Sequence, residues 1–229
     1  MKAVVIGGHT RDIGKTSVMC ALIREFAPLG WTAVKITQYG HGICSRDGRV
    51  CDCAPGEHPF AVTEETDAQG PGDTCRYLAA GARRSLWLRV RQGQLATALP
   101  LLRRKLLRAE WVVIESNSIL EFISPLLYLV VLDASRSDFK PSAERFLAKA
   151  DAFVVPGEKA IHIARDLALW PGIEPRGFLS APVFPVLKSG FWSAALADFS
   201  RNRLSAPACS GRHSSLDQHS PLLEPRWPD

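Results

Sequence analysis

A glycine-rich segment near the N-terminus contains the residues with the clearest chemistry. It reads Gly7-Gly8-His9-Thr10-Arg11-Asp12-Ile13-Gly14-Lys15-Thr16-Ser17, between an apolar run and a helical pattern. Such a turn aims backbone N–H groups at one point, with the positive end of a helix dipole behind them. Gly14 leaves room for phosphate oxygens, Lys15 can reach the β- and γ-phosphates, and the Thr16 hydroxyl can bind Mg²⁺. The segment predicts a phosphate-binding loop whose nucleotide contacts come from Gly8, His9, Thr10, Arg11, Asp12, Ile13, Gly14, Lys15, Thr16 and Ser17.

The loop departs in length from the usual G-x-x-x-x-G-K-S/T pattern. Five residues separate Gly8 from Gly14, and His9 stands where the first glycine would be. A chance G-K-T at the start of a helix is the alternative. The apolar run before the loop and the helical pattern after it favour nucleotide binding.

A carboxylate at the end of a second apolar run is the expected partner of this loop. The run Trp111–Glu115 is apolar up to its last residue. A carboxylate in that position can hold Mg²⁺ through water or orient the attacking water, and a strand-end cap is the alternative. Asp133 ends another apolar run and is the weaker candidate. We expect Lys15 and Glu115 to be catalytic, and Thr16 and Glu115 to hold Mg²⁺.

Thiols and imidazoles gather in the segment His41–His58. Sulfur and nitrogen ligands at this density suit a closed tetrahedral Zn²⁺ site or, as an alternative, an iron–sulfur cluster. The C-x-C spacing is not that of a standard zinc finger, and a polar loop with free thiols is equally compatible with it. The expected zinc ligands are Cys44, Cys51, Cys53 and His58, with His41 as the alternative fourth ligand.

Short apolar runs alternate with helical patterns and predict the elements that position these residues. Strands are expected at Ala3–Ile6, Ala33–Ile36, Leu86–Val90, Trp111–Glu115, Leu126–Asp133, Phe153–Val155 and Val183–Val186. Helices are expected at Lys15–Phe26, Asp73–Ala80, Gln94–Leu107, Pro141–Lys149, Ala160–Leu169 and Phe191–Phe199. Apolar strands separated by helices predict an α/β fold, a three-layer P-loop NTPase with a mostly parallel central sheet. The loops after its strands then meet along one edge, where ligands bind.

Composition indicates one domain and a tail. The 229 residues, 46% of them hydrophobic, fit a domain over 1–204 that contains a polar Cys/His-rich insertion at 39–72. From 205 to 229 the chain is rich in Ser, Pro, His and Arg without periodicity, which predicts a disordered C-terminal tail.

Charge and hydropathy indicate which classes of partner the protein binds. The net charge is +5, and the basic stretch Arg103, Arg104, Lys105 and Arg108 is typical of a solvated helix face rather than a nucleic-acid surface. No apolar run approaches the ~20 residues of a membrane span, and the N-terminus lacks a signal-peptide pattern. We therefore expect a cytoplasmic protein that binds phosphates, with no membrane and no nucleic-acid partner.

The segment Asp67–Ala82 resembles a motif of MobB-type molybdopterin-guanine dinucleotide biosynthesis proteins, which reads D-x-x-G-K-D-S-x-R-x-x-x-A-G-A. Asp73, Arg76 and the Ala80-Gly81-Ala82 triplet are the most specific matches. Lys35 and Glu115 also match the family's pattern, and Ser116 replaces its next glycine. The similarity covers roughly residues 2–133. The loop spacing resembles dethiobiotin synthetase and its relatives among dimeric P-loop enzymes, whose proline after the second-strand lysine is replaced here by Ile36.

The resemblance implies a homodimeric GTP-binding adapter that hydrolyses nucleotide slowly and helps another molybdenum cofactor biosynthesis protein attach a nucleotide to molybdopterin. Two other functions fit the residues. In a metallochaperone-type NTPase the nucleotide would control metal transfer from the cysteine loop. In a dethiobiotin-synthetase-like kinase or ligase, Arg76 or Arg11 would bind the carboxylate of a small metabolite. The later strands lack an N-K-x-D guanine motif, which leaves both ATP and GTP as candidate ligands.

Overall fold

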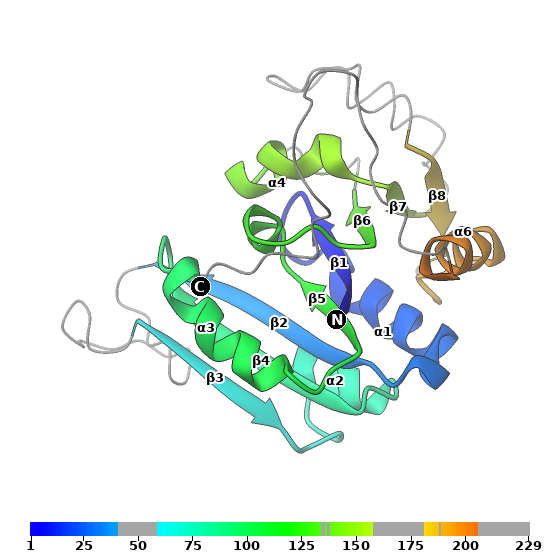
Figure 1. Cartoon of the computed structure of the whole chain (residues 1–229). Helices are drawn as coiled ribbons and strands as arrows, with labels where there is room; N and C mark the ends of the chain where they lie inside the picture. Colours follow the sequence, from blue (N-terminus) through cyan, green and yellow to red (C-terminus); the bar gives the residue numbers. More distant parts are fainter. Residues whose placement is uncertain (41–58, 134–135, 137, 158–180, 188, 206–229) are drawn as a thin grey trace, which may run out of the picture.

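Eight strands form one sheet through the centre of the molecule in a computed structural model of the chain (Figure 1). The structure describes residues 1–40, 59–133, 136, 138–157, 181–187 and 189–205. The strands are β1 (Lys2–Gly8), β2 (Thr32–Tyr39), β3 (Phe60–Glu65), β4 (Arg84–Arg91), β5 (Trp111–Glu115), β6 (Leu127–Val131), β7 (Ala152–Pro156) and β8 (Val183–Val186). The α-helices are α1 (Lys15–Glu25), α2 (Asp73–Ala79), α3 (Leu95–Leu106), α4 (Pro141–Phe146) and α6 (Ala194–Ser205). Short 3-10 helices are η1 (Ala27–Leu29), η2 (Ser118–Glu121) and η3 (Leu147–Lys149).

The order of the strands places β1 near the middle of the sheet. The order is β3-β4-β2-β5-β1-β6-β7-β8, and every neighbouring pair is parallel except β3 with β4. From β1 the chain first builds the β2–β5 side and later the β6–β8 side. The carboxyl end of β1 is therefore a switch point, the usual place for a ligand in such sheets.

Helices cover both faces of the sheet, which makes three layers. One buried cluster joins α3 and α4 to side chains such as Leu86 and Leu88 of β4. The other joins α1, α2 and α6 to side chains such as Val4 and Ile6 of β1. Because both faces are covered, the central strands are apolar at nearly every position instead of alternating. The predicted fold class, with its mostly parallel sheet, is confirmed.

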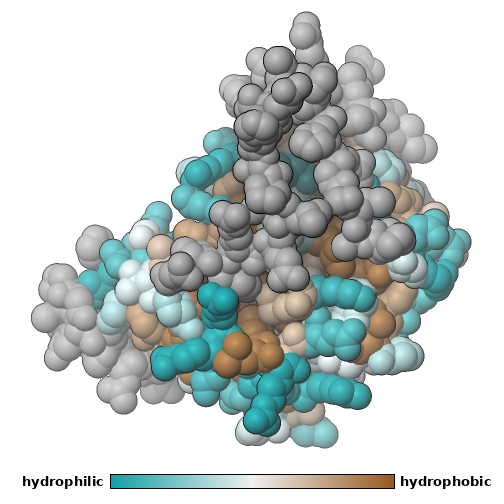
Figure 2. Space-filling model, viewed as in Figure 1, coloured by the Kyte–Doolittle hydropathy of each residue, from teal (hydrophilic) through white to brown (hydrophobic). Residues whose placement is uncertain are grey.

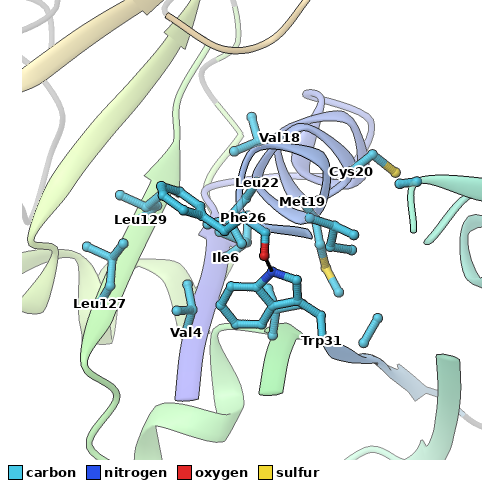
Figure 3. Close-up of a cluster of buried hydrophobic side chains, with 14 of the residues drawn as sticks. Val4, Ile6, Val18, Met19, Cys20, Leu22, Phe26, Trp31, Leu127 and Leu129 are labelled. Carbon is cyan, nitrogen blue, oxygen red and sulfur yellow. Dashed lines mark hydrogen bonds between the residues drawn. The ribbon is translucent and has the colours of Figure 1, made fainter. Parts of the chain in front are cut away.

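The cluster beneath α1 fixes the helix on the sheet (Figure 3). Val18 and Leu22 of α1 are fully buried against the strands. After the helix, the Trp31 indole Nε1 donates a hydrogen bond of 3.0 Å to the Phe26 carbonyl, so its polar atom has a partner inside the core. Burial of an aliphatic side chain of this size contributes about 1.5–3 kcal/mol, so α1 and the loop before it have a rigid support.

The structure corrects two of the predicted elements. Strand β3 lies inside the segment 39–72, which was expected to be a polar Cys/His-rich insertion and for which no strand was predicted. It pairs antiparallel with β4. The last helix was expected to begin at Phe191, but α6 begins at Ala194 and continues to Ser205. The predicted helix Ala160–Leu169 and the tail from residue 206 lie outside the described residues.

The surface of the described part is mixed. On the face shown in Figure 2, hydrophilic side chains lie beside smaller hydrophobic areas. Among the described residues, no helix is long and apolar enough to cross a membrane.

Candidate functional site

The glycine-rich loop connects the end of β1 to the start of α1, as its sequence predicts. Asp12 and Gly14 have positive φ angles of 54° and 97°. Left-handed backbone of this kind turns the chain sharply into the helix, and it suits glycine at position 14. A side chain at Gly14 would also overlap the ring of Phe191. Two independent constraints therefore keep residue 14 a glycine.

A cleft of about 1270 Å³ opens at this end of the sheet. Its walls come from the loop, the carboxyl ends of β2 and β5, and the starts of α1, α2 and α4. Its cationic side chains are Arg11, Lys15, Lys35, Arg76, Lys140 and Arg145. Its acidic side chains are Asp12, Asp73, Glu115 and Glu121. The excess of cations suits an anionic ligand.

Thr16 and Glu115 meet at the floor of the cleft. The Thr16 hydroxyl donates a hydrogen bond of 2.9 Å to Glu115 Oε2. Glu115 is only 7% exposed, and the Tyr77 hydroxyl donates a hydrogen bond to the same oxygen. Burial raises the pKa of Tyr77 well above its ordinary value, and the Glu115 charge raises it further. Tyr77 therefore stays protonated and remains a donor that holds the carboxylate in place.

The side chain of Lys15, the first residue of α1, folds back into the glycine-rich loop. Its Nζ donates a hydrogen bond of 2.7 Å to the Thr10 carbonyl. Burial lowers the pKa of the Lys15 ammonium, and the nearby Glu115 carboxylate opposes that change. A phosphate entering the cleft would replace the solvent that this ammonium has lost.

Lys35, Asp73 and Arg76 form the wall on the α2 side. Lys35 Nζ, from the middle of β2, pairs with the Asp73 carboxylate at the start of α2. The Arg76 guanidinium lies 3.5 Å from the same carboxylate and donates a hydrogen bond of 3.1 Å to the Ser17 hydroxyl. Asp73 and Arg76, two of the residues that carry the resemblance, therefore line the same cleft as the glycine-rich loop, although they are distant from it in sequence.

Residues between β6 and α4 hold the glycine-rich loop from its other side. Lys140 N donates a hydrogen bond of 2.9 Å to the His9 carbonyl, and the Thr10 hydroxyl donates one to Asp138. The His9 ring packs on Phe139 with their centroids 4.9 Å apart. His9 and Thr10 are buried and lie outside the lining of the cleft, unlike the other expected contact residues of the loop. Their side chains support the loop from behind.

Lys140 adds a second cation near Lys15. Burial lowers the pKa of the Lys140 ammonium to about 8, and the charges of Lys15 and Arg11 contribute to the shift. These cations repel one another while no anion separates them. An anion bound between them would relieve that repulsion.

Asn117 ties β1 to the segment after β5, a connection that the sequence did not reveal. Its side-chain oxygen accepts a hydrogen bond of 3.0 Å from Gly8 N, and its amide nitrogen donates one of 2.8 Å to Gly8 O. The Tyr128 hydroxyl donates to the same oxygen at 3.3 Å. A polar residue two positions after the strand-end Glu115 was the available signal.

We expect Asn117→Ala to lower the free energy of unfolding by about 2–4 kcal/mol, because two buried backbone groups of Gly8 would lose their partners. Urea denaturation measures the change. Asn202→Ala, at an exposed position of α6, is the control and should change stability by less than about 0.5 kcal/mol. Equal stability of the two variants would contradict the role of Asn117.

The other expected sites have different outcomes. Asp133 does not line the cleft, which leaves Glu115 as the carboxylate beside Thr16. The expected zinc ligands Cys44, Cys51, Cys53 and His58, with the alternative His41, lie outside the described residues. Within the part of the chain that the structure describes, no three His, Cys, Asp or Glu side chains are grouped to hold a metal. Cys20 and Cys75 are buried free thiols.

Comparison with known proteins finds no relative by sequence. No protein-family model and no curated protein matches the chain. Among solved structures, HypB from Helicobacter pylori in complex with nickel is similar over 92% of this chain and 90% of that one. The sequence identity is 15% and the TM-score 0.45. A likeness this low carries no information about the ligand of this chain, which has to be inferred from its own cleft.

Proposed function

We propose that the protein binds a nucleoside triphosphate with Mg²⁺ in the cleft at the end of β1 and hydrolyses it slowly. The observation that carries this proposal is the meeting of the Thr16 hydroxyl and the Glu115 carboxylate, 2.9 Å apart, at the opening of α1. Lys15 is the first residue of α1, and its ammonium reaches back to the Thr10 carbonyl of the loop. A glycine loop, a lysine and a hydroxyl–carboxylate pair in this order are what a phosphate chain with its metal requires.

The oxygen atoms of Thr16 and Glu115 are suitable ligands for Mg²⁺. A hydroxyl and a carboxylate supply hard oxygen ligands, and Mg²⁺ commonly takes one or two such protein ligands while it keeps several waters. Bound there, Mg²⁺ would neutralise charge on the β- and γ-phosphates. Thr16 and Glu115 would hold it, and the hydrogen bond from Tyr77 would keep the Glu115 carboxylate turned toward Thr16.

Residues of the cleft would bind the phosphates and assist their hydrolysis. Lys15 would bind phosphate oxygens and stabilise the charge that develops as the terminal phosphoryl group departs. Glu115 would orient the attacking water, since its carboxylate lines the cleft beside the Thr16 hydroxyl in the first turn of α1. Arg76 and Lys140 stand on opposite walls, and each adds a positive charge near the phosphates.

The biological role proposed for this nucleotide site is that of an adapter in molybdopterin-guanine dinucleotide biosynthesis, acting as a homodimer in the cytoplasm. Its support is the sequence resemblance and the location of its residues, because Lys35, Asp73 and Arg76 all line the cleft. The cysteine-rich segment supports the other candidate, a metallochaperone-type NTPase in which Cys44, Cys51, Cys53 and His58 bind zinc. A small-molecule kinase would instead use Arg76 or Arg11 to bind an acidic substrate.

Calorimetry with MgATP and MgGTP tests the proposed site, and one nucleotide per chain is the expected result. Absence of binding by both would overturn the proposal. The roles then separate by what stimulates turnover: a molybdenum cofactor biosynthesis protein for the adapter, or a small carboxylic acid for the kinase. A zinc content that changes with the bound nucleotide would favour the metallochaperone.

A further inference from the structure

Phe191 is a strained aromatic residue in the wall of the cleft. Its φ angle is 54°, in the left-handed region that a bulky side chain rarely occupies. It lies in the turn between β8 and α6, where Gly190 N and Phe191 N both donate to the Leu187 carbonyl, at 3.1 and 2.8 Å. Strain of this kind costs of order 1–3 kcal/mol and is found where the surroundings over-determine the conformation, often at ligand sites.

The residues after Phe191 fix that conformation. Trp192 packs edge-on against Phe26 at the end of α1, with ring centroids 6.4 Å apart. The Ser193 hydroxyl accepts a hydrogen bond of 3.3 Å from Leu196 N and so caps α6. The turn is therefore anchored through Trp192 and Ser193, and Phe191 is held over the glycine-rich loop. Its ring lies against Gly14, where any side chain would overlap it.

The location of Phe191 relative to the metal end of the cleft indicates what the ring would meet. Glu115 belongs to β5, on one side of β1 in the sheet. Phe191 follows β8, on the opposite side of β1, and it lines the same cleft. A phosphate chain with its metal at Thr16 and Glu115 and its middle over Gly14 therefore leads its nucleoside toward Phe191.

We propose that Phe191 is the base-stacking residue of this site, with its ring against the face of the nucleotide's base. This inference rests on the proposed nucleotide binding and adds how the nucleoside half of the ligand is held. Stacking uses the π-face that every base has, so the contribution of Phe191 does not depend on the base. The left-handed backbone and the glycine beneath the ring together bring an aromatic face to the phosphate loop.

Three ligands and three variants test the assignment by calorimetry. The ligands are MgATP, MgGTP and inorganic tripolyphosphate with Mg²⁺, which has the phosphates without the nucleoside. Phe191→Ala should weaken both nucleotides by about 10-fold or more, as loss of one stacking contact does. Tripolyphosphate affinity should stay within about twofold. Phe191→Trp should retain the nucleotide affinity of the unaltered protein.

Phe199→Ala is the matched control, because Phe199 packs on Phe184 beside the same buried cluster as Phe191 and does not line the cleft. It should leave all three affinities unchanged. The assignment is wrong if Phe191→Ala weakens tripolyphosphate as much as the nucleotides, since the ring would then only support the loop. Unchanged nucleotide affinity in Phe191→Ala would also overturn it. Failure of the unaltered protein to bind tripolyphosphate or nucleotide is a different result, which refutes the phosphate site itself.

Discussion

Lys15→Ala should lower the affinity for MgATP and MgGTP by at least about 100-fold while the protein remains folded. The ammonium lies within the glycine loop and lines the cleft, so it can make two charge-assisted contacts with phosphate oxygens. Such contacts contribute about 1.5–3 kcal/mol each, which corresponds to a loss of this size. Calorimetry with each nucleotide measures the loss, and thermal denaturation checks the fold.

The control for this variant is Lys149→Ala, which removes a lysine that is outside the lining of the cleft. Its affinity for both nucleotides should equal that of the unaltered protein, so a general effect of lowered positive charge is excluded. If Lys15→Ala binds both nucleotides as tightly as the control does, the phosphate-loop interpretation of this segment fails.

Glu115→Gln should slow hydrolysis by about 100-fold and change nucleotide affinity by less than about threefold. The amide keeps the size of the side chain and an oxygen that can accept from Thr16 and Tyr77. It loses the charge that would hold Mg²⁺ and orient water, and removal of one such electrostatic contribution costs about 100-fold or more in turnover. Single-turnover kinetics with bound nucleotide separates this step from binding.

Glu121→Gln is the matched control, because Glu121 lines the same cleft and pairs with Arg145 at 3.3 Å instead of contacting Thr16. Its turnover should stay within about threefold of the unaltered protein. Equal turnover in the two variants would mean that Glu115 serves only to support the loop through Thr16 and Tyr77.

Local sequence patterns were sufficient to predict the strands and the helix at the centre of the fold. The strand before the glycine loop, the helix after it and the strand Trp111–Glu115 each show several consecutive residues of one pattern. Strand β3 does not, because it follows a polar segment and ends in Glu64 and Glu65. It is an edge strand whose pairing with β4 depends on a distant part of the chain. A half-exposed strand of six residues has too little pattern of its own to be recognised.

Site residues that belong to a local sequence motif could be predicted from the sequence. Site residues whose role depends on tertiary contacts could not. Lys15 and Thr16 belong to one motif, and Glu115 followed from its position at the end of a buried strand. Tyr77 looks like any aromatic residue of a helix until α2 packs on α1 and turns its hydroxyl to Glu115. Phe191 was expected to begin a helix, but its backbone angle and its hydrogen bond to the Leu187 carbonyl show that it belongs to a turn.

The two outermost strands of the sheet limit how copies of this chain can join. Strand β8 has four residues and contains Pro185, which lacks the N–H that a neighbouring strand would need. Strand β3 ends with two glutamates, and Glu64 is engaged by Arg84 at 2.7 Å. A short strand with proline and a strand with charges are both common means of preventing edge-to-edge pairing. Neither described edge favours a continuous intermolecular sheet, so the expected homodimer would have to form through side-chain surfaces.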